Sequence, residues 1–529
     1  MKLPLTPIRC LYRGVDLYGK KVGVVSGSSR YTYAEFGERC ERLAAGLRAE
    51  GVRTGDRVAF LSYNNNQLLE GYYGAPLLRA VVMPMNVRLT AAELTQILNH
   101  AEPAILIFEN EFAAQVESFR KCCASIRRYV AIDGASPAAD FTYEDLLGRG
   151  RLERPDLLSF NEDEIAELFY TSGSTGSPKG VALSHRTLYL HALAVTGSIT
   201  QNDRFVELHT IPLFHANGWG RPQTAILNGA KQAMVRRFEP GHVLKLIEDE
   251  RATGMSLVPV MGNALVNYPD LGKFDVSSME EIHLGGAAAT PELVKRLEQA
   301  FGCRVMAGYG LTETSPVATS SRTKATLAYR DEEHRLAYAA MAGWPILGNE
   351  VRVIDSNMHD VPRDMTTIGE VVIRGDNVMD SYFREPEATA AVMSQGWLHT
   401  GDMAVWDEEN YIQIVDRKKD IIISGGENIS SIEVERAISM HAAVLECAVV
   451  AAPHPKWGEA VAAIITLKPG QQLSHPELTA FLEPRLAKFK LPCIVEFRQE
   501  PLPKTGTGKI LKRELREAFW QGKERRVGE

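Results

Sequence analysis

The stretch YTSGSTGSPKG occupies residues 170–180 and combines three glycines with several small hydroxyl side chains and one lysine. Glycines let backbone N–H groups converge on an anion, hydroxyls add donors, and a lysine adds positive charge. The spacing differs from the Walker A loop, G-x-x-x-x-G-K-[ST], because Gly180 follows Lys179 where that loop has a hydroxyl residue. The stretch therefore predicts a phosphate-binding loop of another kind, and a plain surface loop is the alternative.

Short β-rich runs alternate with amphipathic stretches on both sides of this loop. This alternation predicts an α/β fold with largely parallel sheets. The expected strands are RVAFLS (57–62), AVVMPM (80–85), AILIF (104–108), YVAID (129–133), MSLVPV (255–260) and CRVMA (303–307), the helices include 33–51 and 291–302, and a further helix opens at Ser184.

The pattern changes to strands and turns from about residue 340 to 416, which predicts a β-rich, barrel-like subdomain. The charged segment RKKD (417–420) follows, and we place a domain boundary there. This gives a large domain over 1–418 and a small α+β domain over 419–529. In the small domain we expect helices over 432–440 and 477–489 and strands over 448–453, 460–468 and 493–498.

Composition excludes several classes of protein. A net charge of −7 and a pI near 6.1 argue against a nucleic-acid partner. The seven cysteines form no CxxC pair, which favours a reducing cytoplasm over a disulfide framework. No run of residues approaches the apolar length that spans a bilayer, so we expect a cytoplasmic protein without a membrane span.

Three further segments carry residues suited to nucleotide chemistry. GYGLTETSP (308–316) follows an expected strand, at the sheet edge where open α/β folds bind ligands. Its Tyr309 offers a flat face to a base, and Glu313 offers a hard oxygen to magnesium. GWLHTGD (396–402) places Asp402 where it can accept ribose hydroxyls, and PKTGTGK (503–509) places Lys509 on a Gly-rich loop. Taken singly, each segment also fits an ordinary solvated turn.

The four segments, in this order, resemble the adenylate-forming superfamily of acyl-CoA synthetases, peptide-synthetase adenylation domains and beetle luciferases. The resemblance runs from YTYAEF (31–36) to KILKRELR (509–516) and includes DRKKDIIISGGENISSIEVE (416–435). It implies ATP, Mg²⁺ and coenzyme A as ligands, and Glu313 as the magnesium ligand. The implied ATP phosphate site is Thr171, Ser172, Gly173, Ser174, Thr175, Gly176 and Lys179, and the implied adenosine site is Gly285, Gly286, Ala287, Tyr309, Gly310, Thr312, Asp402 and Arg417.

The resemblance also implies a two-step reaction. A carboxylate attacks the α-phosphorus of ATP with Lys509 bridging the two anions, and the small domain then turns about Lys419 so that a thiol reaches the acyl-AMP. Some members have Asp at the hinge position, so Lys419 is a mild departure. The resemblance implies that His215 is a catalytic residue at the mouth of the acyl pocket and that Trp219 and Gly308 form part of its wall. It implies that the path of CoA is lined by Gly425, Gly426 and Trp457.

Three functions remain open at this level. The first is a carboxylic acid:CoA ligase, the second an adenylating enzyme that loads a separate carrier or oxidises its adenylate, and the third a nucleotide-binding regulator without turnover. The expected acyl wall, residues 215–219, 285–289 and 314–318, holds no fixed charge, which favours an uncharged medium-chain aliphatic acid. Aryl or alicyclic acids fit the same wall. Many relatives are dimers, so a homodimer is compatible with the resemblance.

Overall fold

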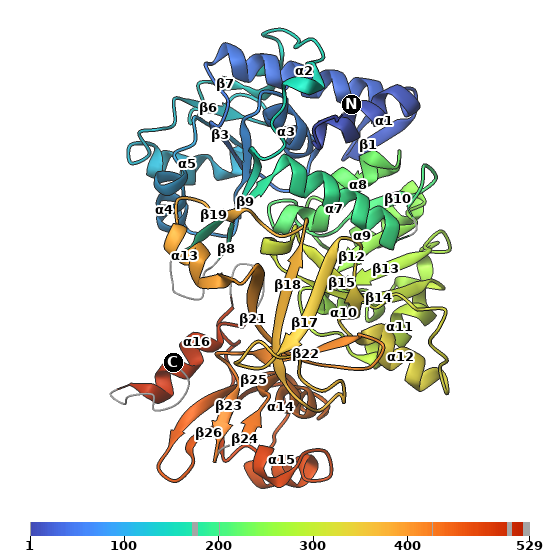
Figure 1. Ribbon diagram of the computed structural model, residues 1–529, viewed down its shortest axis with the longest axis vertical. Helices are drawn as coiled ribbons and strands as arrows, with labels where there is room; N and C mark the ends of the chain where they lie inside the picture. Colours follow the sequence, from blue (N-terminus) through green and yellow to red (C-terminus); the bar gives the residue numbers. More distant parts are fainter. Residues whose placement is uncertain (1, 172–177, 200, 426, 505–509, 522–529) are drawn as a thin grey trace. The chain divides into compact units, whose positions relative to one another are not determined.

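The computed structural model describes residues 2–171, 178–199, 201–425, 427–504 and 510–521. The chain forms two compact units (Figure 1). The first contains residues 1–351, 373–398 and 409–412, and the second contains 352–372, 399–408 and 413–529. The second unit thus includes short segments that precede Lys419, while the boundary at 418/419 and the hinge stay predictions.

Two sheets organise the first unit. The eight-stranded sheet has the order β19-β9-β8-β4-β3-β5-β6-β7, in which β4, β3, β5 and β6 pair in parallel. Its strands are β3 (Arg57–Leu61), β4 (Val81–Pro84), β5 (Ile105–Phe108), β6 (Arg128–Ala131), β7 (Phe141–Thr142), β8 (Ile165–Thr171), β9 (Lys179–Ser184) and β19 (Ser381–Tyr382).

The nine-stranded sheet has the order β16-β15-β14-β13-β12-β10-β11-β1-β2. The strands from β14 to β1 pair in parallel, as the alternating pattern predicted. Its members are β1 (Val22–Ser26), β2 (Ser29–Thr32), β10 (Val206–His209), β11 (Lys231–Met234), β12 (Gly254–Leu257), β13 (Glu281–Leu284), β14 (Arg304–Gly310), β15 (Val317–Ser320) and β16 (Trp344–Pro345).

Helices flank both sheets (Figure 1). Local signals fix several of their ends: Thr32 and Glu35 form a capping box at the start of the helix over 33–49, and Ser184 accepts a hydrogen bond from the N–H of Thr187. The helices are α1 (Ile8–Tyr18), α2 (Tyr33–Ala49), α3 (Asn66–Leu77), α4 (Ala91–Ala101), α5 (Ala113–Arg120), α6 (Tyr143–Leu147), α7 (His185–Ser198), α8 (Arg221–Leu227), α9 (Pro240–Glu250), α10 (Pro259–Val266), α11 (Pro291–Phe301), α12 (Glu332–Ala340) and α13 (Pro386–Val392).

The β-rich segment forms the expected small sheet, with the order β17-β18-β21-β20 and β22 beside β21. Its strands are β17 (Asn349–Ile354), β18 (Gly369–Gly375), β20 (Met393–Ser394), β21 (Trp397–Trp406) and β22 (Ile412–Arg417). The C-terminal region is α+β, with β23 (Ile422–Ser424), β24 (Glu427–Ile429), β25 (Val444–His454), β26 (Gly458–Leu467) and β27 (Ile494–Arg498) and with α14 (Ser431–Ser439), α15 (His475–Leu482) and α16 (Lys512–Trp520).

Several sequence-based boundaries differ from the structure. The strand expected over 448–453 begins earlier, at Val444. Two elements end earlier than expected, both next to a proline. The strand expected over 255–260 ends at Leu257, because Pro259 starts α10 at a position where proline suits a helix. The helix expected over 477–489 ends at Leu482, because Pro484 has no N–H to donate to the preceding turn and its ring crowds the carbonyl there.

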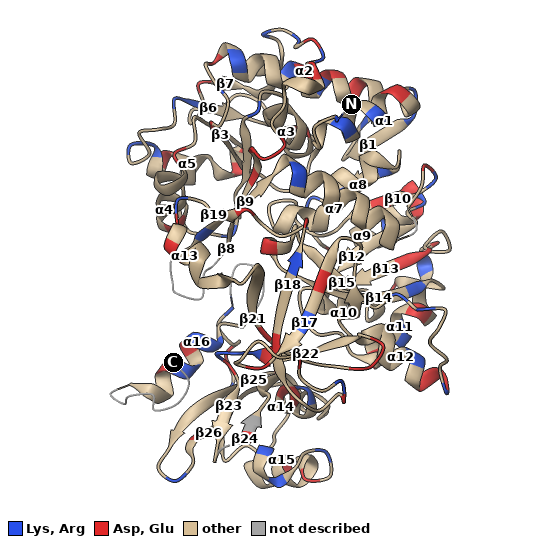
Figure 2. Cartoon of the chain, in the orientation of Figure 1, with Lys and Arg blue, Asp and Glu red and all other residues tan. Residues whose placement is uncertain are grey.

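Charged residues of both signs are interspersed along both units (Figure 2). None of the helices that the structure describes is long and apolar enough to cross a membrane.

Candidate functional site

The predicted phosphate loop joins two antiparallel neighbours, β8 and β9. Thr171 pairs with Lys179 and Tyr170 pairs with Gly180, so both ends of the loop are held side by side. Of the predicted loop residues, Ser172, Gly173, Ser174, Thr175 and Gly176 lie outside the described residues. The sheet therefore fixes where the loop starts and returns.

Lys179 and Glu313 meet at one tyrosine. The ammonium of Lys179 lies 4.9 Å from the ring centroid of Tyr382. The hydroxyl of the same tyrosine donates to Oε1 of Glu313 at 2.8 Å, and the N–H of Met379 donates to the Glu313 carbonyl at 2.8 Å. Two residues far apart in sequence, one suited to phosphate and one to a divalent cation, thus converge in the first unit.

The segment GYGLTET leaves β14 through a turn that needs glycine. A Cβ on Gly310 would lie 1.8 Å from the carbonyl oxygen of Pro316, and one on Gly308 would lie 2.9 Å from that of Thr319. Both glycines are therefore required by the close approach of the neighbouring chain, whatever ligand they also contact. Thr312 and Glu313 follow in a short 3₁₀ turn, with Thr312 buried.

Trp219 lies against the glycines predicted for the acyl and adenosine wall. A Cβ built on Gly285 would be 2.9 Å from the Trp219 ring, and one on Gly286 would be 3.6 Å from it. The tryptophan is carried by Ala216–Gly220, in which five successive residues have φ between 45° and 73°. Non-glycine residues rarely adopt this left-handed conformation, so the turn is a strained one. His215, the residue before this turn, is exposed. Ala287, predicted for the adenosine site, is also exposed.

Asp402 and Arg417 form an ion pair in the second unit. Nε of Arg417 lies 2.5 Å from Oδ1 of Asp402, which is 3% exposed. Gly401 has a φ of +68°, and its carbonyl accepts from the N–H of Lys418 at 2.9 Å. The turn and the guanidinium together fix the orientation of the carboxylate.

The predicted hinge and CoA residues also lie in the second unit. Gly425 has a φ of +60°, and its N–H donates to the carbonyl of Trp457 at 3.0 Å. Trp457 is 44% exposed and stacks on His454 at 4.3 Å between centroids. Gly426 lies outside the described residues. Burial lowers the pKa of Lys419.

Lys509 also lies outside the described residues, but both ends of its loop are placed. Lys504 and Ile510 form an antiparallel bridge across the base of the loop. Glu446 holds this base, because its Oε1 accepts from the N–H of Leu502 at 2.8 Å and its Oε2 lies 2.5 Å from Nζ of Lys504.

Comparisons with known proteins agree with this geometry. A family model described as AMP-binding enzyme matches residues 11–383, and one described as AMP-binding enzyme C-terminal domain matches residues 433–509. The chain belongs to the AMP-binding enzyme family. Within that family it falls in the acyl-CoA synthetase branch of the adenylate-forming superfamily, as the motifs predicted.

Three relatives illustrate the similarity. The chain is 39% identical to a long-chain-fatty-acid–CoA ligase of Thermus thermophilus, over 96% of this chain and 94% of that one. It is 34% identical to a 4-hydroxybutyrate–CoA ligase of Metallosphaera sedula, over 97% and 94% of the two chains. The crystal structure of the anthranilate CoA ligase AuaEII with anthranoyl-AMP matches with a TM-score of 0.87 and 25% identity, over 98% of each chain.

Within this AMP-binding enzyme, sequence reasoning missed residues that support the predicted ones. Tyr382 lies in none of the sequence motifs, so its role could not be predicted from the sequence. Arg516 donates to the carbonyl oxygen of Lys419 at 2.7 Å and pairs with Asp420 at 2.9 Å, so α16 is tied to the predicted hinge. No group of three or more His, Cys, Asp or Glu side chains suited to a metal occurs among the described residues.

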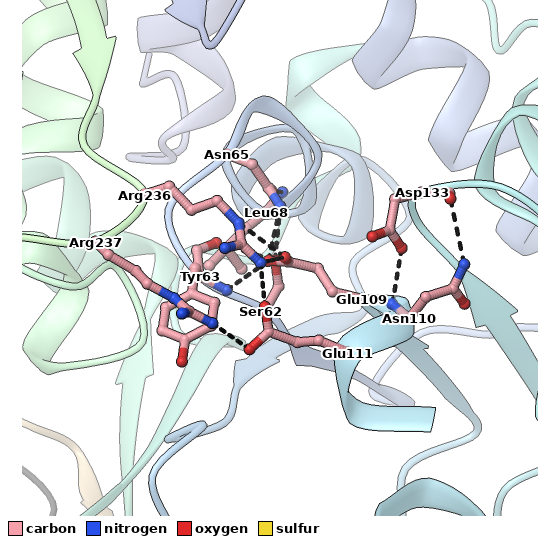
Figure 3. Close-up of polar contacts among 10 residues, drawn as sticks. All are labelled: Ser62, Tyr63, Asn65, Leu68, Glu109, Asn110, Glu111, Asp133, Arg236 and Arg237. Carbon is pink, nitrogen blue, oxygen red and sulfur yellow. Dashed lines mark hydrogen bonds and ion pairs between the residues drawn. The ribbon is translucent and has the colours of Figure 1, made fainter. Parts of the chain in front are cut away.

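A cavity with an arginine-rich lining was also missed. Arg236 and Arg237 each place a guanidinium over the ring of Tyr63, at 4.8 and 4.5 Å from its centroid (Figure 3). Glu109 pairs with Arg236, and Glu111 pairs with both arginines. The cavity has a volume of about 250 Å³ and is lined by Tyr63, Asn64, Arg88, Thr210, Pro212, Phe214, Val235, Arg236, Arg237, Phe238 and Met261. Guanidinium groups beside an aromatic ring suit a phosphate-bearing ligand.

Glu207 gives the enzyme a testable pH dependence. Burial raises the pKa of Glu207 to about 7, although the Arg221 charge opposes the shift. Between about pH 4.5 and pH 7 the unfolded chain loses this proton while the folded chain keeps it, so stability falls as the pH rises through this window. The loss amounts to about 3 kcal/mol. The free energy of unfolding is measured by urea titration at several pH values in this range, for the wild type and for Glu207→Gln. The two plots of free energy against pH should diverge, and parallel plots would contradict the pKa assigned to Glu207.

Proposed function

We propose that this AMP-binding enzyme joins an uncharged, medium-chain aliphatic acid to CoA in two steps. In the first, a carboxylate oxygen forms a bond to the α-phosphorus of ATP, the bond to pyrophosphate breaks, and acyl-AMP results. In the second, the CoA thiolate attacks the acyl carbonyl and AMP leaves. The convergence of Lys179 and Glu313 on Tyr382 carries this proposal, because it joins a phosphate contact to a cation ligand in a chain related throughout to CoA ligases.

The residues have distinct tasks in the first step. Lys179 and the loop from Thr171 hold the β- and γ-phosphates, and Thr312 contacts the α-phosphate. Tyr309 stacks on adenine beside Gly285, Gly286, Ala287 and Gly310, while Asp402, held by Arg417, accepts the ribose hydroxyls. Because both reactants are anions, positioning and charge neutralisation supply most of the rate acceleration. His215 and Lys509 act at the attacking carboxylate.

Magnesium fits the site at Glu313. Its carboxylate is oriented by the Tyr382 hydroxyl and offers the hard oxygen ligand that Mg²⁺ prefers. When bound, the ion neutralises phosphate charge. The ring of the same tyrosine lies beside the ammonium of Lys179.

The second step has its own set of residues. We assign the thiol path to Gly425, Gly426 and Trp457, and the change of arrangement between the steps to Lys419. The arginine-lined cavity supports a place for the phosphates of CoA, because Arg88, Arg236 and Arg237 line it together.

Trp219 and the glycines beside it favour an uncharged acyl group. The indole ring lies against Gly285 and Gly286, which have no side chains of their own. This wall offers no charged partner, so a second carboxylate or an amine on the acyl group would be buried unpaired. The flat indole face also suits a ring, so an aryl acid is the second candidate. The relatives named above are ligases for a fatty, a hydroxylated and an aromatic acid, so similarity does not distinguish an aliphatic from an aryl substrate.

A panel of acids tests both the reaction and the substrate. Straight-chain acids from butyrate to dodecanoate are compared with benzoate and cyclohexanecarboxylate, and pyrophosphate, AMP and thioester are measured with and without CoA. We expect repeated turnover only with CoA, with equal amounts of AMP and thioester and a maximum at one chain length. Repeated turnover without CoA would indicate an enzyme of another kind, an aryl maximum would favour the second candidate, and no turnover would leave a nucleotide-binding protein.

A further inference from the structure

The sheet face below Trp219 changes from apolar to polar. Successive residues of a strand face opposite sides, so Gly285, His283 and Glu281 point to one side of the sheet, the side that Trp219 covers. The parallel register places Ser256 beside His283. Gly254 lies between Glu207 and Glu281 in the register, so these two glutamates share a row, four residues along the strand from Gly285. The acyl wall therefore continues into a row of polar side chains.

Arg221 faces this row from the helix side. It starts α8, two residues after Trp219, and is only 5% exposed. Its Nε lies 3.9 Å from Oε1 of Glu207, beyond hydrogen-bond distance. Burial, and after it the Arg221 charge, lower the pKa of His283.

Several buried polar atoms in this region have no hydrogen-bond partner among the described residues. They include the donors Nε and Nη1 of Arg221 and Nε2 of Gln232, the acceptor Oε2 of Glu281, and the hydroxyl of Ser256, which can donate or accept. Buried polar groups are almost always paired, so a cluster of exceptions points to a polar occupant. We call Arg221, Gln232, Ser256 and Glu281 the polar floor.

The mixture of donors and acceptors limits what the occupant can be. An alkyl end would leave these atoms unpaired, at a cost of about 1–3 kcal/mol for each buried group. A second carboxylate would lie near the Glu281 carboxylate, and like charges at short range disfavour ionisation. A hydroxyl both donates and accepts, so it satisfies the two kinds of atom without adding charge.

We propose that the polar floor binds a terminal hydroxyl group, and that the preferred substrates are uncharged acids hydroxylated at the end away from the carboxylate. This inference rests on the proposed acid–CoA ligase function and narrows its substrate class. A site built to bond a hydroxyl discriminates strongly against analogues that lack it.

Matched pairs of acids test the proposal. We compare kcat/KM for hexanoate and 6-hydroxyhexanoate, octanoate and 8-hydroxyoctanoate, and decanoate and 10-hydroxydecanoate, in pyrophosphate release with CoA. At one chain length the hydroxy acid should be preferred at least about tenfold. Equal use, or preference for the alkanoate at every length, would overturn the proposal and leave water as the occupant. Failure of every acid would instead refute the ligase function.

Two variants locate the effect. Ser256→Ala removes a hydroxyl that has no partner, so it should not disturb folding, and the preference for the hydroxy acid should fall about fivefold or more. Ser198→Ala is the matched control, because its buried hydroxyl already donates to the carbonyl of Ala194. The control should keep the wild-type preference. An unchanged preference in Ser256→Ala, or an equal fall in both variants, would remove the polar floor from substrate selection.

Discussion

Replacing Lys509 by alanine is expected to slow acyl-AMP formation about 10²- to 10³-fold, while thioester formation from supplied acyl-AMP is spared. The carboxylate and the α-phosphate repel each other, and one preorganised cation between them contributes roughly 3 to 4 kcal/mol to the transition state. In the second step the CoA sulfur attacks the acyl carbonyl and AMP leaves, so a cation between a carboxylate and the α-phosphate is not required. The two residues that flank this loop, Lys504 and Ile510, form a bridge at its base, and Glu446 holds that base.

The two half-reactions are measured separately. ATP–pyrophosphate exchange reports the first, and conversion of acyl-AMP plus CoA to thioester reports the second. Lys488→Ala, an exposed lysine of the same unit, serves as the control for loss of charge and should leave both rates unchanged. Equal losses in the two half-reactions of Lys509→Ala would contradict the role assigned to this residue.

Replacing Lys512 by methionine should destabilise the C-terminal unit by about 3–5 kcal/mol, the usual cost of removing one partner from a buried ion pair. Nζ of Lys512 lies 2.8 Å from Oε1 of Glu435 and donates to Oγ of Ser431 at 2.5 Å. The same serine donates to Asp416 through its N–H and its hydroxyl, both at 2.6 Å. One cation therefore compensates two buried carboxylates.

The pKa directions agree with this account. Burial alone would lower the pKa of Lys512, but Glu435 and Asp416 outweigh it, and the pKa is raised. Burial raises the pKa of both carboxyl groups, because a single ammonium cannot fully compensate the two. Without Lys512 both carboxylates would remain buried and uncompensated.

A matched surface pair supplies the control. Lys490 pairs with the more exposed Glu433 at 2.8 Å, so Lys490→Met should cost less than about 1 kcal/mol. The free energy of unfolding is measured for both variants by denaturant titration, with a probe in the C-terminal unit. Similar small losses in the two variants would show that the Lys512 cluster does not anchor α16.

Much of the fold followed from the sequence because its signals are local. The strands over 57–61 and 105–108 and the helix over 291–301 lie where the apolar periodicity predicted them. Ser184 caps α7 through its own hydroxyl, three residues from its partner. The Gly-rich loop and GYGLTET carry their chemistry within a few residues, so they could be recognised before any folding was known. The wrong ends at Leu257 and Leu482 arose where a proline outweighed the apolar pattern.

The sequence by itself determined the family, the α/β order of the elements and the candidate residues of each motif. Only the tertiary structure brought Tyr382 to Lys179 and Glu313, set Trp219 on Gly285, and turned Arg221 toward Glu207. These contacts depend on strand order and register, which join segments separated by tens to hundreds of residues. Local periodicity fixes which face of a strand is buried, but it does not specify which distant side chain will lie against that face.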